Sequence, residues 1–463
     1  MITFFISPEG NDKANGTSSD HPFATLNHAQ SAVNQHAGKA PITVYLREGT
    51  YTQNQTFTLA EQDSGSPSAP IIYRPYKHET VRIVGNRTQT DNQHTQISPL
   101  VSLDNVHHIT FQNLVFESTS GDGIVIKEGA NNQIVDCSIR ELNNTGIIID
   151  GGQNHILQSC NINHTSNSGI RIHGGDRLTL THSDHKVDNC HLHHTSQDTK
   201  AKEPAIRVSG VGIQISHNHI HDCLHNAISL SGNEHLIEYN RIHNVCLTSD
   251  DTGAIHMGDD WTERGIRIQY NFFHDIESIG IQMNNCASGS LILKNVFARC
   301  TNAVFIGGGR NHRIDNNIFF QCEPALQIDG RGLDTDPRWH DLIYTILKAR
   351  FEAQNPLEPP YSQKYPELRE VAMYYQAENG IPPEGNIALR NIVDQSTYHH
   401  IHWHATQNMI AIQNNLIYED PHFIDSDNGN YQLQEDSPAY EIGIKPIPFE
   451  QMGLYNDAFR QAT

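Results

Sequence analysis

The sequence predicts an all-β protein, a single-stranded right-handed parallel β-helix in which the chain winds as a solenoid. Two short motifs alternate along the chain, and five of the eight spacings between copies of the first motif are 22–24 residues. The hydrophobic content is 37%, which suits a long, thin core, because each coil of a solenoid packs only against its neighbours. A repeated period of this kind indicates the architecture.

The first motif is Asn or Cys, any residue, then a large apolar residue. In stacked coils its first residues would form an internal column of amides and small thiols. The column comprises Asn113, Cys137, Cys160, Cys190, Asn218, Asn240, Asn271, Asn295 and Asn317. Cysteines in such a column act as small buried side chains, so Cys137, Cys160 and Cys190 are not expected to form disulfides. Reduced cysteines favour a reducing compartment.

The second motif is a small residue followed by apolar-x-apolar, about ten residues later in each coil. Two apolar residues that flank one outward residue have strand periodicity. The motif begins at Gly123, Gly146, Gly169, Ala205, Ala227, Ala254, Gly280, Ala303 and Ala325. A β-sandwich need not repeat the same residue at the same phase, and the leucine-dominated consensus of leucine-rich repeats is absent.

The repeats divide the chain into four regions. These are 1–100 (N-terminal cap and first coils), 101–330 (regular coils), 331–385 (partly helical insertion) and 386–463 (closing coils and C-terminal wrap). Helical spacing is expected at 24–36 in the cap and at 339–351 and 365–376 in the insertion. Early strands are expected to begin at Ile42 and Ile71.

The composition excludes several classes of partner. The formal net charge is −21, which argues against nucleic acid as a partner, since phosphate binding needs clustered Lys and Arg. The same charge makes a long polyanionic glycan less favourable as a ligand, unless a local basic patch binds it. No run approaches the roughly 20 apolar residues of a membrane span. The start of the sequence lacks the features of a secretory signal. We therefore expect a cytoplasmic protein, or a secreted or periplasmic one whose signal peptide has been removed.

Intervals longer than the basic coil mark loops, which in repeat proteins often surround the binding face. These loops flank the apolar-x-apolar strands, whose outward residues form a floor with steps of about 4.8 Å. The floor comprises Arg171, Arg207, Ser229, His256, Gln282, Phe305 and Gln327. At the far end of the same strands lie His173, Asp259, Asp260, Asn284, Asn285 and Asp329. A polar floor between long loops predicts a carbohydrate-binding groove. The predicted substrate-binding residues are Arg171, Arg207, His256, Trp261, Gln282, Asn284, Asn285 and Asp329.

Glycoside hydrolysis needs two carboxyl groups, one of which acts as acid and the other as nucleophile or base. The coil from Asp250 to Trp261 holds four aspartates and one histidine. Asp251, Asp259 and Asp260 are the predicted catalytic residues, and Trp261 is expected to stack on a sugar. Acids at opposite ends of a strand can pair only if their loops fold inward. The alternative roles for these aspartates are loop capping and a structural Ca²⁺ site.

No metal-ligating residues and no cofactor are predicted. The zinc motif HExxH is absent. An HxxxH spacing links His217 to His221 and His221 to His225. This spacing places two ligands on one face only in a helix, whereas the stretch has the pattern of strand and turn.

The same coil resembles β-helical glycosidase-like proteins around glycoside hydrolase family 141 and, more distantly, family 120. The matching stretches begin at Phe5 (FISPEGND), Asp251 (DTGAIHMGDDWTERG) and Tyr270 (YNFFHDI), with further likeness near Ser437 (SPAY) and Gly443. The resemblance implies hydrolysis of a plant or algal poly- or oligosaccharide.

Two positions of that family, Asp251 and Asp260, carry over to this chain. Those relatives tend to have a paired Asp-Asp before Ser-Gly, where this chain has Asn284 and Asn285. Amides cannot serve as acid or nucleophile. Either Asp259, Glu277 or Asp329 takes the role, or the specificity or mechanism differs, or the protein does not hydrolyse.

Three functions are therefore compared. The first is a glycoside hydrolase that uses the aspartates. The second is a polysaccharide lyase in which Arg171 and Arg207 neutralise a uronate and His256 or a lysine acts as base. The third is a non-catalytic glycan-binding β-helix, which the Asn284–Asn285 pair favours.

Overall fold

The computed structural model describes residues 1–85, 99–198, 200, 202–249, 251–333 and 337–461. Asp250, one of the acids of the predicted site, lies outside these residues. The chain forms two compact units. Unit 1 comprises Met1–Gly175, Ser183–Arg207 and Tyr455–Thr463, and unit 2 comprises Asp176–His182 and Val208–Leu454.

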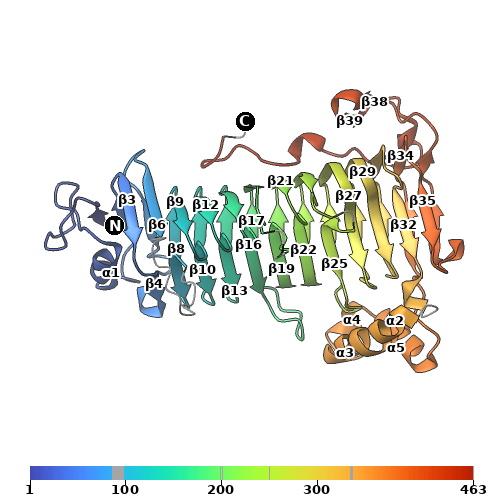
Figure 1. Ribbon diagram of the computed structural model, residues 1–463, viewed down its shortest axis with the longest axis horizontal. Helices are drawn as coiled ribbons and strands as arrows, with labels where there is room; N and C mark the ends of the chain where they lie inside the picture. The colour runs from blue at the N-terminus through green and yellow to red at the C-terminus, as the bar shows by residue number, and fades with distance from the viewer. Residues whose placement is uncertain (86–98, 199, 201, 250, 334–336, 462–463) are drawn as a thin grey trace. The chain divides into compact units, whose positions relative to one another are not determined.

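Each unit is a stack of parallel coils, and each coil contributes short strands to three rows (Figure 1). In unit 1, row 1 consists of β1 (Ile2–Ile6), β2 (Ile42–Leu46), β5 (Ile71–Pro75), β8 (Ile109–Gln112), β11 (Gln133–Val135), β14 (Ile156–Gln158) and β17 (Lys186–Asp188). Row 2 consists of β3 (Gly49–Gln53), β6 (Val81–Gly85), β9 (Val115–Thr119), β12 (Ser138–Leu142), β15 (Asn161–Thr165) and β18 (His191–His193). Row 3 consists of β4 (Phe57–Ala60), β7 (Val101–Asp104), β10 (Ile124–Lys127), β13 (Ile147–Asp150) and β16 (Ile170–Gly174).

Unit 2 repeats this arrangement, and the boundary between the units falls within β19 (Ile206–Val211). Row 1 consists of β20 (Gln214–Ser216), β23 (Leu236–Glu238), β26 (Arg267–Gln269), β28 (Leu291–Leu293), β30 (Arg313–Asp315), β33 (Asn386–Leu389) and β36 (Ile410–Gln413). Row 2 consists of β21 (His219–Cys223), β24 (Arg241–Val245), the first halves of β27 (Phe272–Asn284) and β29 (Val296–Gly307), β31 (Ile318–Phe320), β34 (Ile392–Asp394) and β37 (Leu416–Ile417). Row 3 consists of β22 (Ile228–Asn233), β25 (Gly253–Gly258), the second halves of β27 and β29, β32 (Leu326–Asp329) and β35 (His399–His402). The predicted parallel β-helix is confirmed.

An asparagine ladder runs through unit 2, as the first motif predicts. The side-chain amide of each asparagine donates to Oδ1 of the next at 2.9–3.1 Å. The ladder consists of Asn218, Asn240, Asn271, Asn295, Asn317, Asn391 and Asn415. Each Oδ1 also accepts from the backbone N–H of the preceding asparagine. The buried amides are therefore satisfied within the column, which explains how a polar residue repeats in the core.

The first copy of the motif is displaced by one residue from its predicted position. Ser138 of β12 pairs with Val115 of β9, so the residue that stacks below Cys137 is Leu114 rather than Asn113. Asn113 has φ 54°, a left-handed conformation that asparagine tolerates in turns. Asn113 thus turns the chain just before the column. Cys137, Cys160 and Cys190 are buried free thiols, as expected.

The predicted helices are also present. In unit 1, α1 (Leu26–Asn34) begins at Thr25, whose side chain accepts from the backbone N–H of His28. In unit 2 the insertion forms α2 (Pro337–Asp341), a π-helical turn (Leu342–Leu347), α3 (Lys348–Ala353), α4 (Tyr361–Lys364) and α5 (Leu368–Ala377). These helices gather beside β32, and the hairpin of β38 (Phe423–Asp425) and β39 (Asn430–Leu433) lies in the C-terminal wrap (Figure 1). Within the described residues, no helix is long and apolar enough to cross a membrane.

Candidate functional site

The outward residues of row 3 in unit 2 form the predicted floor. Cα pairing connects Ser229, His256, Gln282, Phe305 and Gln327 from coil to coil. His400 of β35 extends the floor by one step beyond the insertion. Gln282 and Phe305 are only 2% and 6% exposed, because neighbouring side chains cover them, whereas His256 is partly exposed. The middle of the floor is therefore covered.

The two arginines of the predicted floor belong to unit 1 and share one carboxylate. Arg171 Nη2 lies 2.8 Å from Glu203 Oε1, and Arg207 Nη2 lies 2.9 Å from Oε2. Burial alone would raise the pKa of Glu203, but the hydrogen bonds and charges of the two arginines outweigh it and lower that pKa. Glu203 thus already offsets part of the positive charge that a uronate would need.

Asp260 and Trp261 are buried. Asp260 is 3% exposed; its Oδ2 lies 3.1 Å from Arg177 Nη1, and its Oδ1 accepts from the backbone and hydroxyl of Thr262. Trp261 is fully buried against the insertion, where its Nε1 donates to Tyr375 Oη at 2.8 Å. The prediction that Trp261 stacks on a sugar is therefore wrong. Asp260 is a buried ion-pair partner that a glycosidic bond cannot reach.

Glu263 lies beside this ion pair and shares Arg177 with Asp260. Its Oε1 is 3.7 Å from Arg177 Nη1, and its Oε2 has no hydrogen-bond partner among the described residues. Burial, followed by the charge of Asp260, raises the pKa of Glu263 to about 8. One arginine cannot neutralise two buried carboxylates, so Glu263 retains its proton at neutral pH.

This proton predicts a pH-dependent stability. The unfolded chain loses the Glu263 proton near its ordinary pKa of 4.5, and the folded chain loses it near 8. Unfolding therefore releases a proton within that window, and Glu263 makes the free energy of unfolding fall by about 1.4 kcal/mol per pH unit as pH rises. Glu263→Gln removes this contribution. Urea denaturation should therefore show that the free energy of unfolding of the variant rises relative to that of the wild type between pH 5 and pH 8. The exposed Glu435, replaced by Gln, is the control; an unchanged difference between Glu263→Gln and wild type would refute the prediction.

Arg331 organises the other end of the predicted site. Its guanidinium binds Asp329 through Nε at 2.9–3.0 Å and through Nη2 at 2.6 Å. Nη1 donates to Oδ1 of Asn284 and, at 2.9 Å, to Oδ1 of Asn285. Asp329 is 0% exposed, so its predicted role in binding substrate is wrong, and it is not the missing catalytic acid.

The same contacts explain the amides at 284 and 285. Both accept from Arg331, whose charge Asp329 already balances. Carboxylates at these positions would add negative charge around one guanidinium. Asn285 Nδ2 also donates to Asp259 Oδ1 at 2.7 Å. Asn284 and Asn285 therefore hold neighbouring charged side chains in position.

Aromatic rings surround Arg331. The guanidinium carbon lies 5.3 Å from the ring centre of Phe305, 4.7 Å from Trp339 and 5.8 Å from Trp403. Trp403 is 46% exposed. Arg331, Trp339 and Trp403 were not predicted from the sequence, because Arg331 and Trp339 lie in the insertion and Trp403 directly follows β35. Extending the row of floor residues by one more coil, to residues 397–402, would have identified β35 as a further strand of row 3.

The predicted acids cannot form one catalytic pair. β25 separates Asp251 from Asp259, and its five steps of about 3.3 Å span about 17 Å. Catalytic carboxylates lie about 5–9.5 Å apart. Asp259 is held at its end of the strand by Asn285 and by Arg350, which donates to the Asp259 carbonyl at 2.7 Å.

Glu277 is a second exposed acid, in the coil next to that of Asp251. Gly253 of β25 pairs with Ile279 of β27, so Asp251 and Glu277, each two residues earlier, occupy matching positions in adjacent coils. Ser278 Oγ donates to the Thr252 carbonyl at 2.6 Å, which joins the two segments. Asp251 and Glu277 are both exposed, and Gln282 Nε2 lies 3.5 Å from Asp251 Oδ1.

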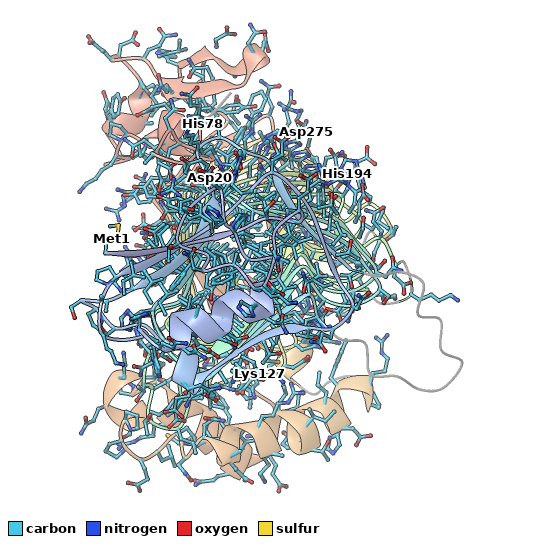
Figure 2. The ribbon with its side chains drawn as sticks, turned by 90° about the vertical axis from the view of Figure 1, so that its left-hand side faces the viewer. Met1, Asp20, His78, Lys127, His194 and Asp275 are labelled. Atoms are coloured by element: carbon cyan, nitrogen blue, oxygen red, sulfur yellow. The ribbon has the colours of Figure 1, made fainter. Side chains whose placement is uncertain are left out.

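A polar cavity of about 630 Å³ opens at this edge. It is lined by Asn244, Val245, Cys246, Leu247, Thr248, Ser249, Asp275, Glu277 and Arg299. Leu247 is 50% exposed, and Asp275, at the surface (Figure 2), is paired with Arg299. The cavity therefore combines one apolar platform, several hydrogen-bonding groups and the Glu277 carboxylate.

Two models of β-helix regions match the chain. Residues 4–225 match "Pel9A-like, right handed beta helix region", and residues 204–335 match "Right handed beta helix region". Two curated proteins share shorter segments. The uncharacterized protein YwoF of Bacillus subtilis is 34% identical over 116 residues, which is 25% of this chain and 22% of that protein. Pectate lyase PEL9 of Emericella nidulans is 41% identical over 81 residues, 18% of either chain. The matched segments thus span about a fifth of each relative's length.

Solved structures resemble most of the chain at low sequence identity. A glycoside hydrolase has a TM-score of 0.54 and 12% identity, with 74% of this chain and 98% of that chain covered. A PL6 family polysaccharide lyase from Pseudopedobacter saltans has a TM-score of 0.54 and 12% identity, with 92% and 97% covered. Together with the two regional matches, these likenesses show that the chain is a right-handed parallel β-helix.

Proposed function

We propose that the protein is a glycoside hydrolase whose catalytic pair is Asp251 and Glu277. The observation that carries the proposal is the position of these two exposed acids in adjacent coils, with Glu277 in the lining of a polar cavity. Adjacent strands are about 4.8 Å apart, so side chains at matching positions can bring their carboxyl groups to the roughly 5–5.5 Å found in retaining glycosidases. Inverting enzymes need a wider gap, so the pair favours retention.

The surroundings suggest a role for each acid. Gln282 Nε2 lies 3.5 Å from Asp251 Oδ1 and can hold this carboxylate in one orientation, which suits a nucleophile. Glu277 then protonates the glycosidic oxygen and later activates the water that releases the sugar. Thr248, Ser249 and Asn244 can bind hydroxyl groups, and Leu247 offers an apolar surface to the C–H face of a ring. The expected substrate is a neutral poly- or oligosaccharide, because the chain carries a net charge of −21. The resemblance to glycoside hydrolase family 141 implies that this glycan is of plant or algal origin.

A polysaccharide lyase is the second candidate, and the 81-residue likeness to a pectate lyase favours it. Lyases cleave without water and leave an unsaturated sugar. Two features weigh against this mechanism: Glu203 already pairs with Arg171 and Arg207, and Arg299 at the cavity pairs with Asp275.

Product analysis separates these functions. The full chain is incubated with a panel of neutral and acidic polysaccharides, and products are followed by mass, ultraviolet absorption and NMR. Hydrolysis is expected to add one water per cleaved bond, to give no ultraviolet-absorbing product, and to release first the anomer present in the substrate. An unsaturated product would establish the lyase instead. Glycan binding without turnover would indicate a non-catalytic glycan-binding protein. Release of the opposite anomer would refute a retaining mechanism by Asp251 and Glu277.

A further inference from the structure

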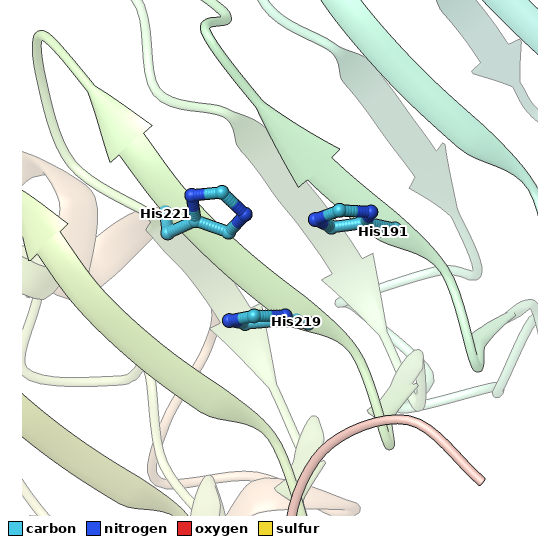
Figure 3. A group of neighbouring side chains, drawn as sticks. All are labelled: His191, His219 and His221. Atoms are coloured by element: carbon cyan, nitrogen blue, oxygen red, sulfur yellow. The ribbon is translucent and has the colours of Figure 1, made fainter. Parts of the chain in front are cut away.

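Histidine pairs with one residue between them project outward from strands of unit 2. On β21 of row 2 the pair is His219 and His221, which alternate with a buried isoleucine (Figure 3). On β35 of row 3 the pair is His400 and His402, whose rings stack with centres 4.8 Å apart. The ring centres of His402 and Trp403, which directly follows β35, are 5.2 Å apart. The pair on β35 therefore adjoins an aromatic surface at the end of row 3.

Two tryptophans, Trp339 of α2 and Trp403, form this surface. Their ring centres are 6.1 Å apart, and their planes are tilted by 38°. Trp403 is 46% exposed and Trp339 is partly exposed, and no described residue accepts a hydrogen bond from either Nε1. Trp261 differs, because it is fully buried and its Nε1 donates to Tyr375. A buried indole N–H normally has a partner, so the two other indoles still have a donor and apolar area to offer to a ligand.

The backbone around Trp403 is fixed by its neighbours. Trp403 has φ 47°, a left-handed conformation that is rare for a bulky residue and persists only where the surrounding structure enforces it. The backbone N–H of Gly330 donates to the Trp403 carbonyl at 3.0 Å. A Cβ atom at position 330 would lie 2.5 Å from Trp403 O, so glycine permits this close approach. The exposed indole is therefore held in place before a ligand arrives, which lowers the entropic cost of binding.

Polar side chains surround the two indoles. Gln327 Nε2 lies 2.9 Å from His402 Nε2, which connects the floor of row 3 to β35. His400 and Arg338 are exposed, and the Arg338 guanidinium carbon lies 5.7–5.9 Å from the centres of both indole rings. A protein–protein interface usually has a contiguous apolar core. A small apolar surface within a polar rim instead suits a ligand that is itself apolar on its faces and polar at its edges.

We propose that Trp403 and Trp339 bind a neutral glycan chain, at a site separate from the Asp251–Glu277 pair. A pyranose ring presents C–H groups on its face, which pack on an indole, and hydroxyl groups at its edge, which need polar partners. The net charge of −21 disfavours a polyanionic chain. Row 3 runs from β25 through β27, β29 and β32 to β35, and these four steps of about 4.8 Å span about 19 Å. Binding at the indoles therefore does not require that the acids hydrolyse the chain.

Tryptophan fluorescence and titration calorimetry of the full chain test the proposal, with Glu277→Gln as the background so that hydrolysis cannot remove the ligand. The probes are xylohexaose, cellohexaose, mannohexaose and galactohexaose, with hexagalacturonate as the acidic comparison. At least one neutral probe is expected to shift the emission and to reduce quenching by acrylamide. Because Trp261 is already buried, this change reports on the two other indoles. Trp403→Ala should weaken binding by about 10-fold or more, and Trp403→Phe, which keeps an aromatic face, by less.

Tyr418→Ala is the matched control, because Tyr418 is a 90% exposed aromatic residue that directly follows β37 of row 2; it should leave the affinity unchanged. Circular dichroism checks that each variant is folded. Equal affinity with and without Trp403→Ala would overturn the proposal, as would binding of hexagalacturonate alone or of no probe. Binding through Trp403 without turnover by the wild type would refute only the hydrolase. Turnover with binding unchanged by Trp403→Ala would refute only this site.

Discussion

Glu277→Gln is expected to lower kcat/KM by about 10²–10⁴-fold, with the fold intact. The side chain is exposed at the rim of the cavity, so the amide removes a proton donor and acceptor without burying a new polar group. General acid–base catalysis contributes a factor of this size. The loss should be smallest for substrates with an activated leaving group, which need little protonation. Initial rates on an aryl glycoside and on the natural glycan measure this difference.

Asp251→Asn should abolish turnover of both kinds of substrate, because formation of the glycosyl-enzyme bond needs the carboxylate. Azide is expected to restore activity partly, by attacking the sugar in place of Asp251. Glu419→Gln, at an exposed glutamate away from the cavity, is the matched control. Full activity in folded Asp251→Asn or Glu277→Gln would remove this pair from the mechanism. Full loss in Asp259→Asn alone would move the site to the other end of β25.

Arg331→Met is expected to destabilise unit 2 by about 3–5 kcal/mol. Asp329 is 0% exposed and binds Arg331 through both carboxylate oxygens, so the variant leaves a buried charge without its partner. It also removes the donor on which Asn284 and Asn285 converge. Urea denaturation followed by circular dichroism measures the change.

The control for Arg331 is its exposed neighbour Arg338. Arg338 also lies over Trp339 and Trp403, at 5.9 and 5.7 Å, so Arg338→Met removes a similar aromatic contact but no buried charge. We expect it to cost less than about 1 kcal/mol. Adding Asp329→Asn to Arg331→Met should recover much of the loss, since the uncompensated charge disappears. A double variant no more stable than Arg331→Met would show that the loss comes from packing alone.

The fold was predictable because it depends on local, repeated information. The Asn-x-apolar motif specifies the buried amide and the inward side chain of each coil, and the hydrogen bonds from Asn218 to Asn415 follow this period. The one displaced position, Asn113, lies where a left-handed turn precedes the column. Asparagine suits both roles, so the residue type alone could not distinguish them.

The candidate site was less predictable, because it depends on contacts between distant residues. Trp261 meets Tyr375, 114 residues later in the sequence, and the helices of the insertion cover it. Asp260 meets Arg177, 83 residues earlier. A carboxylate in a polar coil has the same sequence signature whether it faces a groove or a buried guanidinium. Glu277 could have been ranked above Asp260 by aligning its coil with that of Asp251.

The asparagine ladder allows the loops and insertions between coils to vary in length. Asn317 is followed in the ladder by Asn391, 74 residues later, with the same 3.1 Å contact that joins Asn295 to Asn317. The stacking of one asparagine on the next therefore does not depend on the number of residues between them. An insertion as long as the helical one leaves the register of the coils unchanged. Natural selection can lengthen, exchange or delete such insertions while the amide column is inherited unchanged. Specificity and foldability are thereby encoded by separate residues, and recombination can act on one without risking the other.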